Sequence, residues 1–534
     1  MTFENRTGDE DLDPVGLMAS DGITRTLEAT GVLRGVPAEQ IFSGLGAEAV
    51  GEAHDEADIE ALARSARART VVTGRFYARG DSLQFEARAR DLVRDEITHT
   101  FDPTTAPRSD PAPGLEALQE QIAVALALGV NPTHAAIEVG AHQSASLEAH
   151  RSYTRALRHF ARLNFEDAIT HFEATIEADP DFVAAHIILG TSHWNLGDRE
   201  TADSIWATLE ERRELLTYEQ LLHIRWGRAA AQGDLARAYR LSRELAELVP
   251  GNNANNLLAF TAMALNRPAE AVQALALREY DPDWAPYWWH FGRALHMLGE
   301  YEEELEVGRK AVERVPGDLY VMRGKLRALA ALGQEGEAAR WLDAAMREPW
   351  SDGVSPGDVA RYGGVELRAH GHEEAANEAF TRALEWYRGR VGREDWRPEI
   401  ASTLYEARRW EDARPLAEEL VEEAPDDDEP RSTLEVDFGF LAAGLHGAVV
   451  ARMGDRAEAE GILNELTDAE EAPPEHFYWA ARIASVLGEH DEAVALLERA
   501  FASGSRYWLA LHRTIDFEPL HDHPGFQELL EPDG

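Results

Sequence analysis

Alanine residues recur along most of this chain at one fixed distance from a turn residue. From about residue 147 onward, an alanine stands five residues after a glycine or asparagine, as in Gly197/Ala202, Gly233/Ala238, Asn266/Ala271, Gly333/Ala338, Gly371/Ala376, Gly454/Ala459 and Gly488/Ala493. Ala168 and Ala413 hold the same place without a glycine, whereas Glu304, five residues after Gly299, departs from the rule. Successive positions are mostly 33 to 38 residues apart, with one interval of 46 residues. A period of this length predicts a stack of helical hairpins.

Each repeat is expected to be two helices joined by a tight turn. The glycine or asparagine supplies the left-handed backbone that ends the first helix, and the alanine lets the two helix backbones approach closely. Large residues such as Phe172, Trp206 and Phe380 lie four residues after an alanine and are expected to fill the space between hairpins. Because one hairpin cannot bury its own apolar face, the hairpins are expected to share one core. The pattern therefore predicts a mostly α protein, an α-solenoid of about ten hairpins.

The first 130 residues show a different pattern, in which β-type runs alternate with amphipathic stretches. We expect helices over 16–30, 58–66 and 114–128 and strands over 32–36, 70–77, 83–92 and 96–101. Helices that alternate with strands and lead into a meander are typical of an α/β sheet domain. The predicted organisation is a small α/β domain over 1–130, a linker over 131–146, the solenoid over 147–505, and a capping helix and tail over 506–534. An acidic loop at 422–430 and a second loop at 469–474 are expected to lengthen late repeats.

The residues around the second predicted hairpin resemble tetratricopeptide repeats. The matching residues are Asp179-Pro180-Asp181-Phe182, Leu189-Gly190 and Asn195-Leu196-Gly197-Asp198. The resemblance covers roughly residues 147 to 500, and several of its repeats are degenerate. An unrelated helical array of the HEAT type stays open as the alternative.

The N-terminal residues resemble the TolB amino-terminal-type domain. The resemblance lies in Phe3-Glu4-Asn5-Arg6-Thr7-Gly8-Asp9, Asp21-Gly22-Ile23, Val71-Val72-Thr73-Gly74-Arg75-Phe76, Arg79-Gly80-Asp81-Ser82-Leu83-Gln84-Phe85 and Leu115-Glu116-Ala117-Leu118. In that family a hydrophobic strand precedes the Phe-Glu-Asn motif, so we expect the first strand here to be missing or truncated. This domain followed by tetratricopeptide repeats resembles the C-terminal sensory half of bacterial Ser/Thr kinases, class III nucleotide cyclases and winged-helix regulators. The resemblance implies a regulatory or signalling setting.

The charge and composition of the chain exclude several classes of function. With 52 basic and 97 acidic side chains the formal net charge is −45, which repels nucleic acid and anionic membrane surfaces. The sequence has no cysteine, so disulfides and thiolate chemistry are excluded. We see no signal peptide and no apolar run long enough to span a bilayer. The chain is expected to be cytoplasmic if complete, and extracytoplasmic is the alternative if it is a fragment of a membrane-anchored protein.

No catalytic, cofactor or metal motif stands out, so the sequence predicts a protein that is not an enzyme and has no cofactor. His521-Asp522-His523 lacks a partner ligand, and His370 and His372, which flank Gly371, are expected to be solvated turn residues. The acidic run from Asp426 to Glu429 lacks the ligand spacing of a calcium loop.

The inner groove of the solenoid is the predicted binding surface, because the first helix of each hairpin faces it. Counting back from the turns places twelve candidates there: Trp194, Asn195, His223, Asn253, Asn256, Phe260, Trp289, Arg293, His296, Tyr320, Arg323 and Arg327. The arginines suit a carboxylate, the asparagines a peptide backbone, and the aromatic residues apolar side chains. The competing interpretation is that Trp289, in the aromatic run from Trp284 to Trp289, is core and that the arginines neutralise internal acids such as Glu303 and Glu306.

These observations favour a non-enzymatic scaffold that binds a peptide or a partner protein in its groove. Self-assembly into oligomers or filaments is the alternative, since solenoid ends and the truncated sheet edge can both pair with copies of the chain. Catalysis is the least favoured of the three hypotheses.

Overall fold

The computed structural model describes residues 2–16, 18–19, 22–23, 63, 68, 70–92, 96–129, 147–161, 163–249, 253–277, 284–350, 354–390, 396–423, 441–468, 473–503 and 510–532. The chain divides into two compact units. The first comprises Met1–Ala135, His142–Thr154 and Glu177–Phe182, and the second comprises Ala136–Ala141, Arg155–Ile176 and Val183–Gly534. None of the described helices is both long and apolar enough to cross a bilayer.

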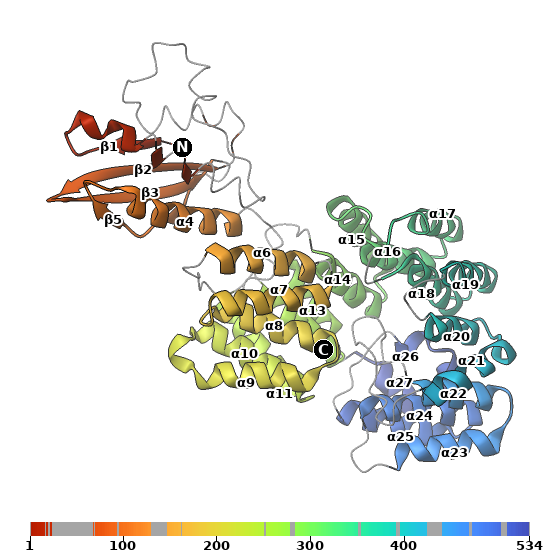
Figure 1. Cartoon of the computed structure of the whole chain (residues 1–534). Helices are drawn as coiled ribbons and strands as arrows, with labels where there is room; N and C mark the ends of the chain where they lie inside the picture. The colour runs from red at the N-terminus through yellow and green to blue at the C-terminus, as the bar shows by residue number, and fades with distance from the viewer. Residues whose placement is uncertain are drawn as a thin grey trace. The chain divides into compact units, whose positions relative to one another are not determined.

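The first unit contains a five-stranded sheet and one long helix (Figure 1). Its elements are β1 (Thr2–Asn5), η1 (Glu10–Leu12), β2 (Thr70–Arg79), β3 (Ser82–Asp91), β4 (Glu96–Thr100), β5 (Thr104–Pro107) and α4 (Ala112–Gly129). Strand β1 pairs in parallel with β2, and β2 forms an antiparallel hairpin with β3. Strands β4 and β5 share the other edge of β3, β4 along its second half and β5 along its first.

The core of this unit joins the sheet to α4 through buried side chains such as Phe3, Phe76, Phe85 and Leu118. Phe3 lies opposite Gly74 in the β1–β2 register, and a Cβ on Gly74 would lie 2.2 Å from the Phe3 ring. Glycine is therefore required there, since any larger residue would displace the ring.

Most of the strands expected in this unit form at close to the predicted bounds, and α4 is the helix expected at 114–128, slightly longer at both ends. The expected first strand differs, because β1 consists of the Phe-Glu-Asn motif itself together with Thr2. Strand β5 was not predicted. The strand expected at 32–36 and the linker at 131–146 lie outside the described residues, as do most of the helices expected at 16–30 and 58–66.

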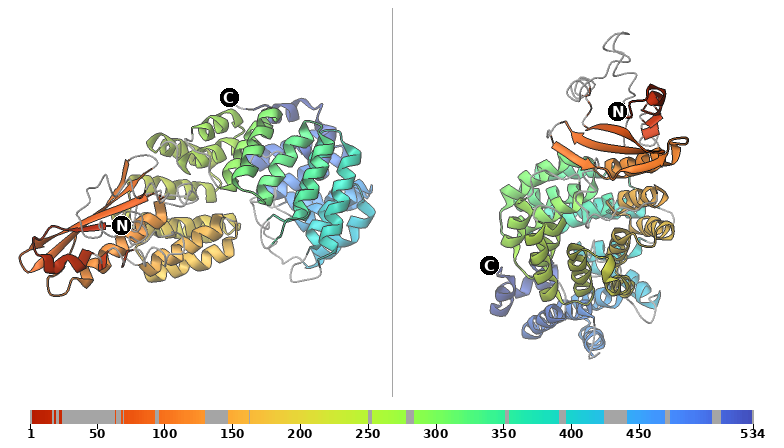
Figure 2. Two further views of the ribbon diagram at one scale, coloured as in Figure 1. Left: turned by 90° about the horizontal axis from the view of Figure 1, so that it is seen from above. Right: turned by 90° about the vertical axis from the view of Figure 1, so that its left-hand side faces the viewer.

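The helices from α6 to α25 form ten hairpins among the described residues, in agreement with the expected number, and Figure 2 shows them following one another along the chain. The first five are α6 and α7 (Leu147–Ala161, Phe165–Ala178), α8 and α9 (Val183–Asn195, Arg199–Glu211), α10 and α11 (Tyr218–Ala231, Leu235–Leu248), α12 and α13 (Asn253–Ala264, Pro268–Ala276), and α14 and α15 (Ala285–Met297, Tyr301–Arg314). The second five are α16 and α17 (Leu319–Ala331, Glu335–Ala345), α18 and α19 (Pro356–Ala369, Glu373–Arg388), α20 and α21 (Arg397–Glu406, Trp410–Glu423), α22 and α23 (Ala442–Arg452, Arg456–Thr467), and α24 and α25 (Pro474–Leu487, His490–Ala502).

The turns of these hairpins have the backbone conformation that the sequence pattern requires. All the turn glycines of the pattern and Asn266 have positive φ, and so do Leu163 and Arg408, which stand where glycine is missing. The alanines five residues later are buried, with exposures between 0% and 2%. The mostly α solenoid behind a small α/β domain is therefore confirmed.

Residues after the tenth hairpin pack back against helices of the later hairpins. Helix α26 (Ala510–Arg513), the 3-10 helix η3 (Ile515–Leu520) and α27 (Pro524–Leu530) follow α25, and η3 contacts α24 while α27 contacts α25. Phe517, Leu520 and Phe526 are completely buried in the core that the last hairpins share. The acidic loop expected at 422–430 and the loop at 469–474 lie largely outside the described residues.

Candidate functional site

The first helices of consecutive hairpins line a cavity of about 130 Å³, which we call the aromatic groove. Its lining residues are Phe160, Leu163, Phe165, Ile187, Ile188, Thr191, Trp194, Asn195, Trp206, His223, Trp226, Asn253, Asn256, Leu257, Phe260, Trp284, Pro286, His290, Arg293 and Tyr320. Most of them belong to α8, α10, α12 and α14. Because each hairpin presents its first helix to the same side, residues far apart in the sequence share one wall.

Aromatic rings form the floor of the aromatic groove. The rings of Trp194, Trp226 and Phe260 meet edge to face, with centroids 5.5 to 6.2 Å apart, and His290 meets Phe260 at 6.0 Å. Edge-to-face contacts of this kind fix ring orientation. The floor is therefore a preformed apolar surface.

Polar atoms that lack partners interrupt this apolar surface. Four lining atoms are buried without a hydrogen-bond partner among the described residues: the indole nitrogens of Trp226 and Trp284, Nε2 of His223 and Oδ1 of Asn256. A buried polar atom without a partner costs about 1–3 kcal/mol. Two of these atoms are donors and two are acceptors, so they match a ligand that offers both.

His223 is held in its neutral form. Its Nδ1 donates to the carbonyl of Glu219 at 3.1 Å, which leaves Nε2 as an acceptor, buried and without a partner among the described residues. Burial lowers the pKa of His223 to about 4. At neutral pH the groove therefore presents an uncharged acceptor at this position.

Arginines from α14 and α16 gather around one indole at the end of the aromatic groove. The guanidinium carbon lies 4.1 Å from the Trp289 ring centroid for Arg323, 4.6 Å for Arg327 and 5.8 Å for Arg293. The Tyr320 ring lies 4.9 Å from the same indole. Stacking on ring faces stabilises these cations without neutralising them.

The charges in this arginine cluster are only partly balanced. Arg327 donates to Glu304 at 2.6 Å. Arg323, 4% exposed, has no carboxylate within ion-pairing distance among the described residues, and its Nε and Nη1 lack hydrogen-bond partners. Burial, together with the charges of Arg327, Arg513 and Arg323, lowers the pKa of Arg293 far below its usual range. Because arginine keeps its proton in proteins, the cluster favours a bound anion.

Glu304, the exception in the alanine pattern, is the acid that organises this cluster. Its side chain is 1% exposed, and it accepts from Arg327 through one oxygen and bonds Nδ1 of His296 at 2.7 Å through the other. Gly292 faces it, where a Cβ would lie 3.6 Å from the Glu304 side chain. The competing interpretation, in which the arginines neutralise internal acids, therefore holds for Arg327, but the acid is Glu304 and neither Glu303 nor Glu306.

All twelve predicted groove residues lie on the first helices of hairpins two to six. Eight of them line the aromatic groove, namely Trp194, Asn195, His223, Asn253, Asn256, Phe260, Arg293 and Tyr320. Trp289, Arg323 and Arg327 lie in the arginine cluster behind it, and His296 is buried against Glu304. Their role in binding stays a prediction.

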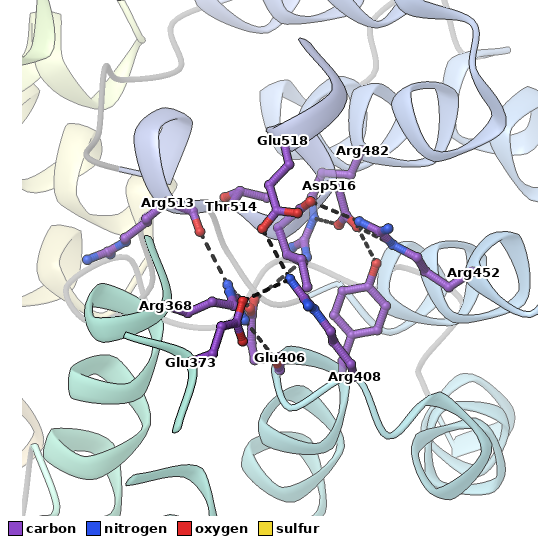
Figure 3. Close-up of polar contacts among 12 residues, drawn as sticks. Arg368, Glu373, Glu406, Arg408, Arg452, Arg482, Arg513, Thr514, Asp516 and Glu518 are labelled. Atoms are coloured by element: carbon purple, nitrogen blue, oxygen red, sulfur yellow. Dashed lines mark hydrogen bonds and ion pairs between the residues drawn. The ribbon is translucent and has the colours of Figure 1, made fainter. Parts of the chain in front are cut away.

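Further along the stack, the C-terminal segment crosses the first helices of the later hairpins (Figure 3). Asp516, fully buried, accepts from Arg482 at 2.7 Å, from Arg452 at 2.8 Å and from Tyr405 at 2.5 Å. Burial would raise the pKa of Asp516, but the charges of Arg482 and Arg452 lower it. One carboxylate therefore joins α20, α22 and α24.

Arg513 continues this contact to the seventh hairpin. It donates to Glu366 at 2.5 Å, and its own carbonyl accepts from Arg368 at 3.3 Å. Burial would raise the pKa of Glu366, but the charges of Arg513, His296 and Arg327 lower it to about 2. Burial lowers the pKa of His512. The charges of His296 and His370 lower it further, whereas the charge of Glu366 opposes the shift.

The crossing segment leaves a second cavity of about 130 Å³, which is more polar than the first. It is lined by Arg361, Tyr362, Val365, Pro398, Glu399, Ser402, Tyr405, Glu406, Leu445, Tyr478, Trp479, Arg482, Ala510, Arg513 and Thr514. Sequence reasoning missed this region, because its contacts join residues 34 to 147 positions apart along the chain. Buried arginines on first helices are the signal that could have suggested it.

His370 also differs from its prediction. It is half-buried rather than solvated, and its ring lies 5.6 Å from that of His296 and 5.4 Å from that of Tyr301. His372 is likewise only partly exposed, and it pairs with Glu335 at 2.7 Å.

Comparison with known proteins identifies the repeats. Residues 153–203, 256–319 and 447–506 match the family model described as tetratricopeptide repeat. One similar solved structure is the crystal structure of a tetratricopeptide repeat protein from Parabacteroides merdae, which is 14% identical. The alignment covers 49% of this chain and 100% of that chain, with a TM-score of 0.30. The search of curated proteins gave no match.

Proposed function

We propose that this chain, which contains tetratricopeptide repeats, is a non-enzymatic interaction protein that binds an extended, acid-bearing peptide segment of a partner protein in the aromatic groove. Tetratricopeptide repeats generally mediate protein–protein interactions. The observation that carries the proposal is the set of four buried, unpartnered polar atoms in an otherwise apolar groove. An extended peptide backbone offers carbonyls to the indole N–H groups of Trp226 and Trp284 and N–H groups to His223 and Asn256.

The aromatic floor supports an apolar side chain as part of the ligand. Trp226 and Phe260 present ring edges and faces in a desolvated cavity, the setting in which aromatic residues dominate binding energy. A large aliphatic or aromatic side chain of the partner would displace solvent there.

The arginine cluster supports an acidic group close to that apolar side chain. The net charge of −45 repels acidic partners at long range, so the acid would be recognised locally. Arg323, buried without an acid of its own among the described residues, gains most from a carboxylate or phosphate.

The test selects random dodecapeptides displayed on phage against the full chain. The expected peptides combine a large apolar residue with Asp or Glu within a few positions. Asn256→Leu, which keeps the side-chain volume but removes the acceptor, should weaken a selected peptide about tenfold. Arg323→Met should remove the preference for acids, and Tyr218→Ala, at a residue 55% exposed, is the matched control. Selection of no consensus, or equal binding by Asn256→Leu, would refute the proposal.

A second measurement separates binding from self-assembly. Light scattering of the full chain over a wide range of concentrations would show assembly as a rising mass. If the chain assembles and the groove variants leave both assembly and peptide binding unchanged, the groove is not the working surface.

The resemblance of the first unit to the TolB amino-terminal-type domain supports a regulatory setting for this interaction. A parallel β1–β2 pair that leads into a meander and a long helix is consistent with that resemblance. In this proposal the first unit docks or dimerises while the solenoid holds the partner, as in the sensory halves of bacterial signalling proteins.

A further inference from the structure

Two histidines and a glutamate meet at the junction of the fifth and seventh hairpins. His296 lies in the last turn of α14, Glu366 lies in the last turn of α18, and His370 is the C-cap residue of α18, four positions after Glu366. One ligand atom from each lies within 4.8 Å of the other two. His296 and Glu366 are buried and His370 is half-buried.

The atoms that face one another are the ones that other contacts leave available. Nδ1 of His296 is bonded to Glu304, which leaves Nε2 3.8 Å from Oε2 of Glu366. The other oxygen of Glu366 accepts from Arg513. A carboxylate behind a histidine, and a hydrogen-bond donor behind a carboxylate, are the supports that orient metal ligands in proteins.

We propose that His296, Glu366 and His370 bind one divalent transition-metal ion of the zinc type. Two imidazole nitrogens and one carboxylate oxygen suit zinc and its neighbours, whereas calcium and magnesium require mostly oxygen ligands. Zinc bonds of about 2.0–2.2 Å place ligand atoms roughly 3.4 Å apart. The three atoms therefore need to close by about 1 Å, and the half-buried His370 is the ligand freest to move.

The surrounding charges set the expected strength of binding. Arg327 and Arg513 already neutralise Glu304 and Glu366, so the site supplies little net negative charge. Binding is therefore expected to be in the micromolar range rather than that of a closed structural zinc site. Such an ion would join α14 to α18 and would lie beside the arginine cluster.

The experiment uses the full chain, stripped with a chelator and dialysed, and titrated with zinc in competition with a chromophoric chelator. One equivalent should bind, and cobalt(II) should give the intense visible absorption of a four-coordinate nitrogen–oxygen site. His370→Ala should weaken zinc at least tenfold and abolish the cobalt spectrum. His372→Ala, two residues away on the same turn but paired with Glu335, should change neither.

A second variant guards against a folding artefact. Glu366→Gln keeps the size of the ligand and removes its charge, and circular dichroism would verify that each variant retains its helices. Failure of the wild-type chain to bind one equivalent, or equal loss of binding in His370→Ala and His372→Ala, would overturn the proposal. Neither result depends on peptide binding, so this inference and the proposed function fail separately.

Discussion

The indole of Trp206 packs directly against the backbone of Gly190. A Cβ on Gly190 would lie 2.5 Å from the indole nitrogen, closer than two such atoms can approach. Trp206 Nε1 also donates to the carbonyl of Ile187 at 3.1 Å, so the N–H edge of the ring is fixed against α8. Because Trp206 lines the aromatic groove, this contact couples the packing of α8 against α9, the two helices of one hairpin, to the shape of the groove.

Gly190→Ala should therefore destabilise the solenoid. The added methyl group must displace a hydrogen-bonded tryptophan in a filled core, which costs about 1–3 kcal/mol. Gly461→Ala is the matched control, because a Cβ there meets nothing within 4 Å and should stabilise α23 by about 0.5–1 kcal/mol. Urea denaturation of both variants would check the opposite signs, and two changes of the same sign would contradict the packing argument.

Asp516→Asn should destabilise the last hairpins strongly. The substitution leaves Arg452 and Arg482 buried around a neutral side chain, and loss of one partner of a buried ion pair costs about 3–5 kcal/mol. Hydrogen exchange should show the loss of protection concentrated in α20, α22 and α24. Glu518→Gln, at a half-exposed residue that pairs with Arg408 at 3.5 Å, should change stability by less than about 0.5 kcal/mol.

Acidification should destabilise the fold through His223. Its pKa in the folded chain is about 4, against 6.5 for an ordinary histidine, so the unfolded chain binds more protons between these values. The contribution of the neutral His223 to the free energy of unfolding is fully present above pH 6.5. It is lost as the pH drops toward 4, by about 3 kcal/mol in total. His223→Gln should flatten this part of the stability–pH curve relative to His490→Gln, and an unchanged slope would show that His223 protonates without cost.

Glu304→Ala should destabilise the chain although alanine is the usual residue at this place in the repeat. The substitution leaves Arg327 and His296 without their acid, at a cost of about 3–5 kcal/mol. Adding Arg327→Met should recover much of that loss, since a buried ion pair can be replaced by apolar residues. A double-mutant cycle measured by thermal denaturation would give the coupling, and strict additivity would contradict a direct pair.

The sequence predicts those parts of the fold that depend on neighbours along the chain. The hairpin turns and the buried alanines follow a local rule, and even Leu163 and Arg408 adopt the left-handed backbone where the rule places it. Strand β5 was not predicted because Pro103 precedes it and Pro107 is its last residue, and proline is confined to the edges of sheets.

In the candidate site, too, the sequence predicts what depends on local spacing and misses what depends on contacts between distant residues. Counting along the first helices places eight predicted residues around the aromatic groove, because that periodicity is local. The partners of Glu304 and Asp516 depend on contacts between hairpins and across the C-terminal segment, which no spacing in the sequence encodes. His370 was interpreted as solvated for the same reason, since α14 and α18 meet only in the folded stack.

The contact between Tyr405 and Asp516, 111 residues apart, has a consequence for the order of folding. In a repeat array each hairpin can in principle fold as soon as its neighbour has formed. During synthesis, however, the eighth to tenth hairpins would leave the ribosome with Arg452, Arg482 and Tyr405 facing an unfilled groove. They complete their core only when Asp516 and Phe517 emerge. The late hairpins are therefore expected to fold as one cooperative block, after the early ones have already formed.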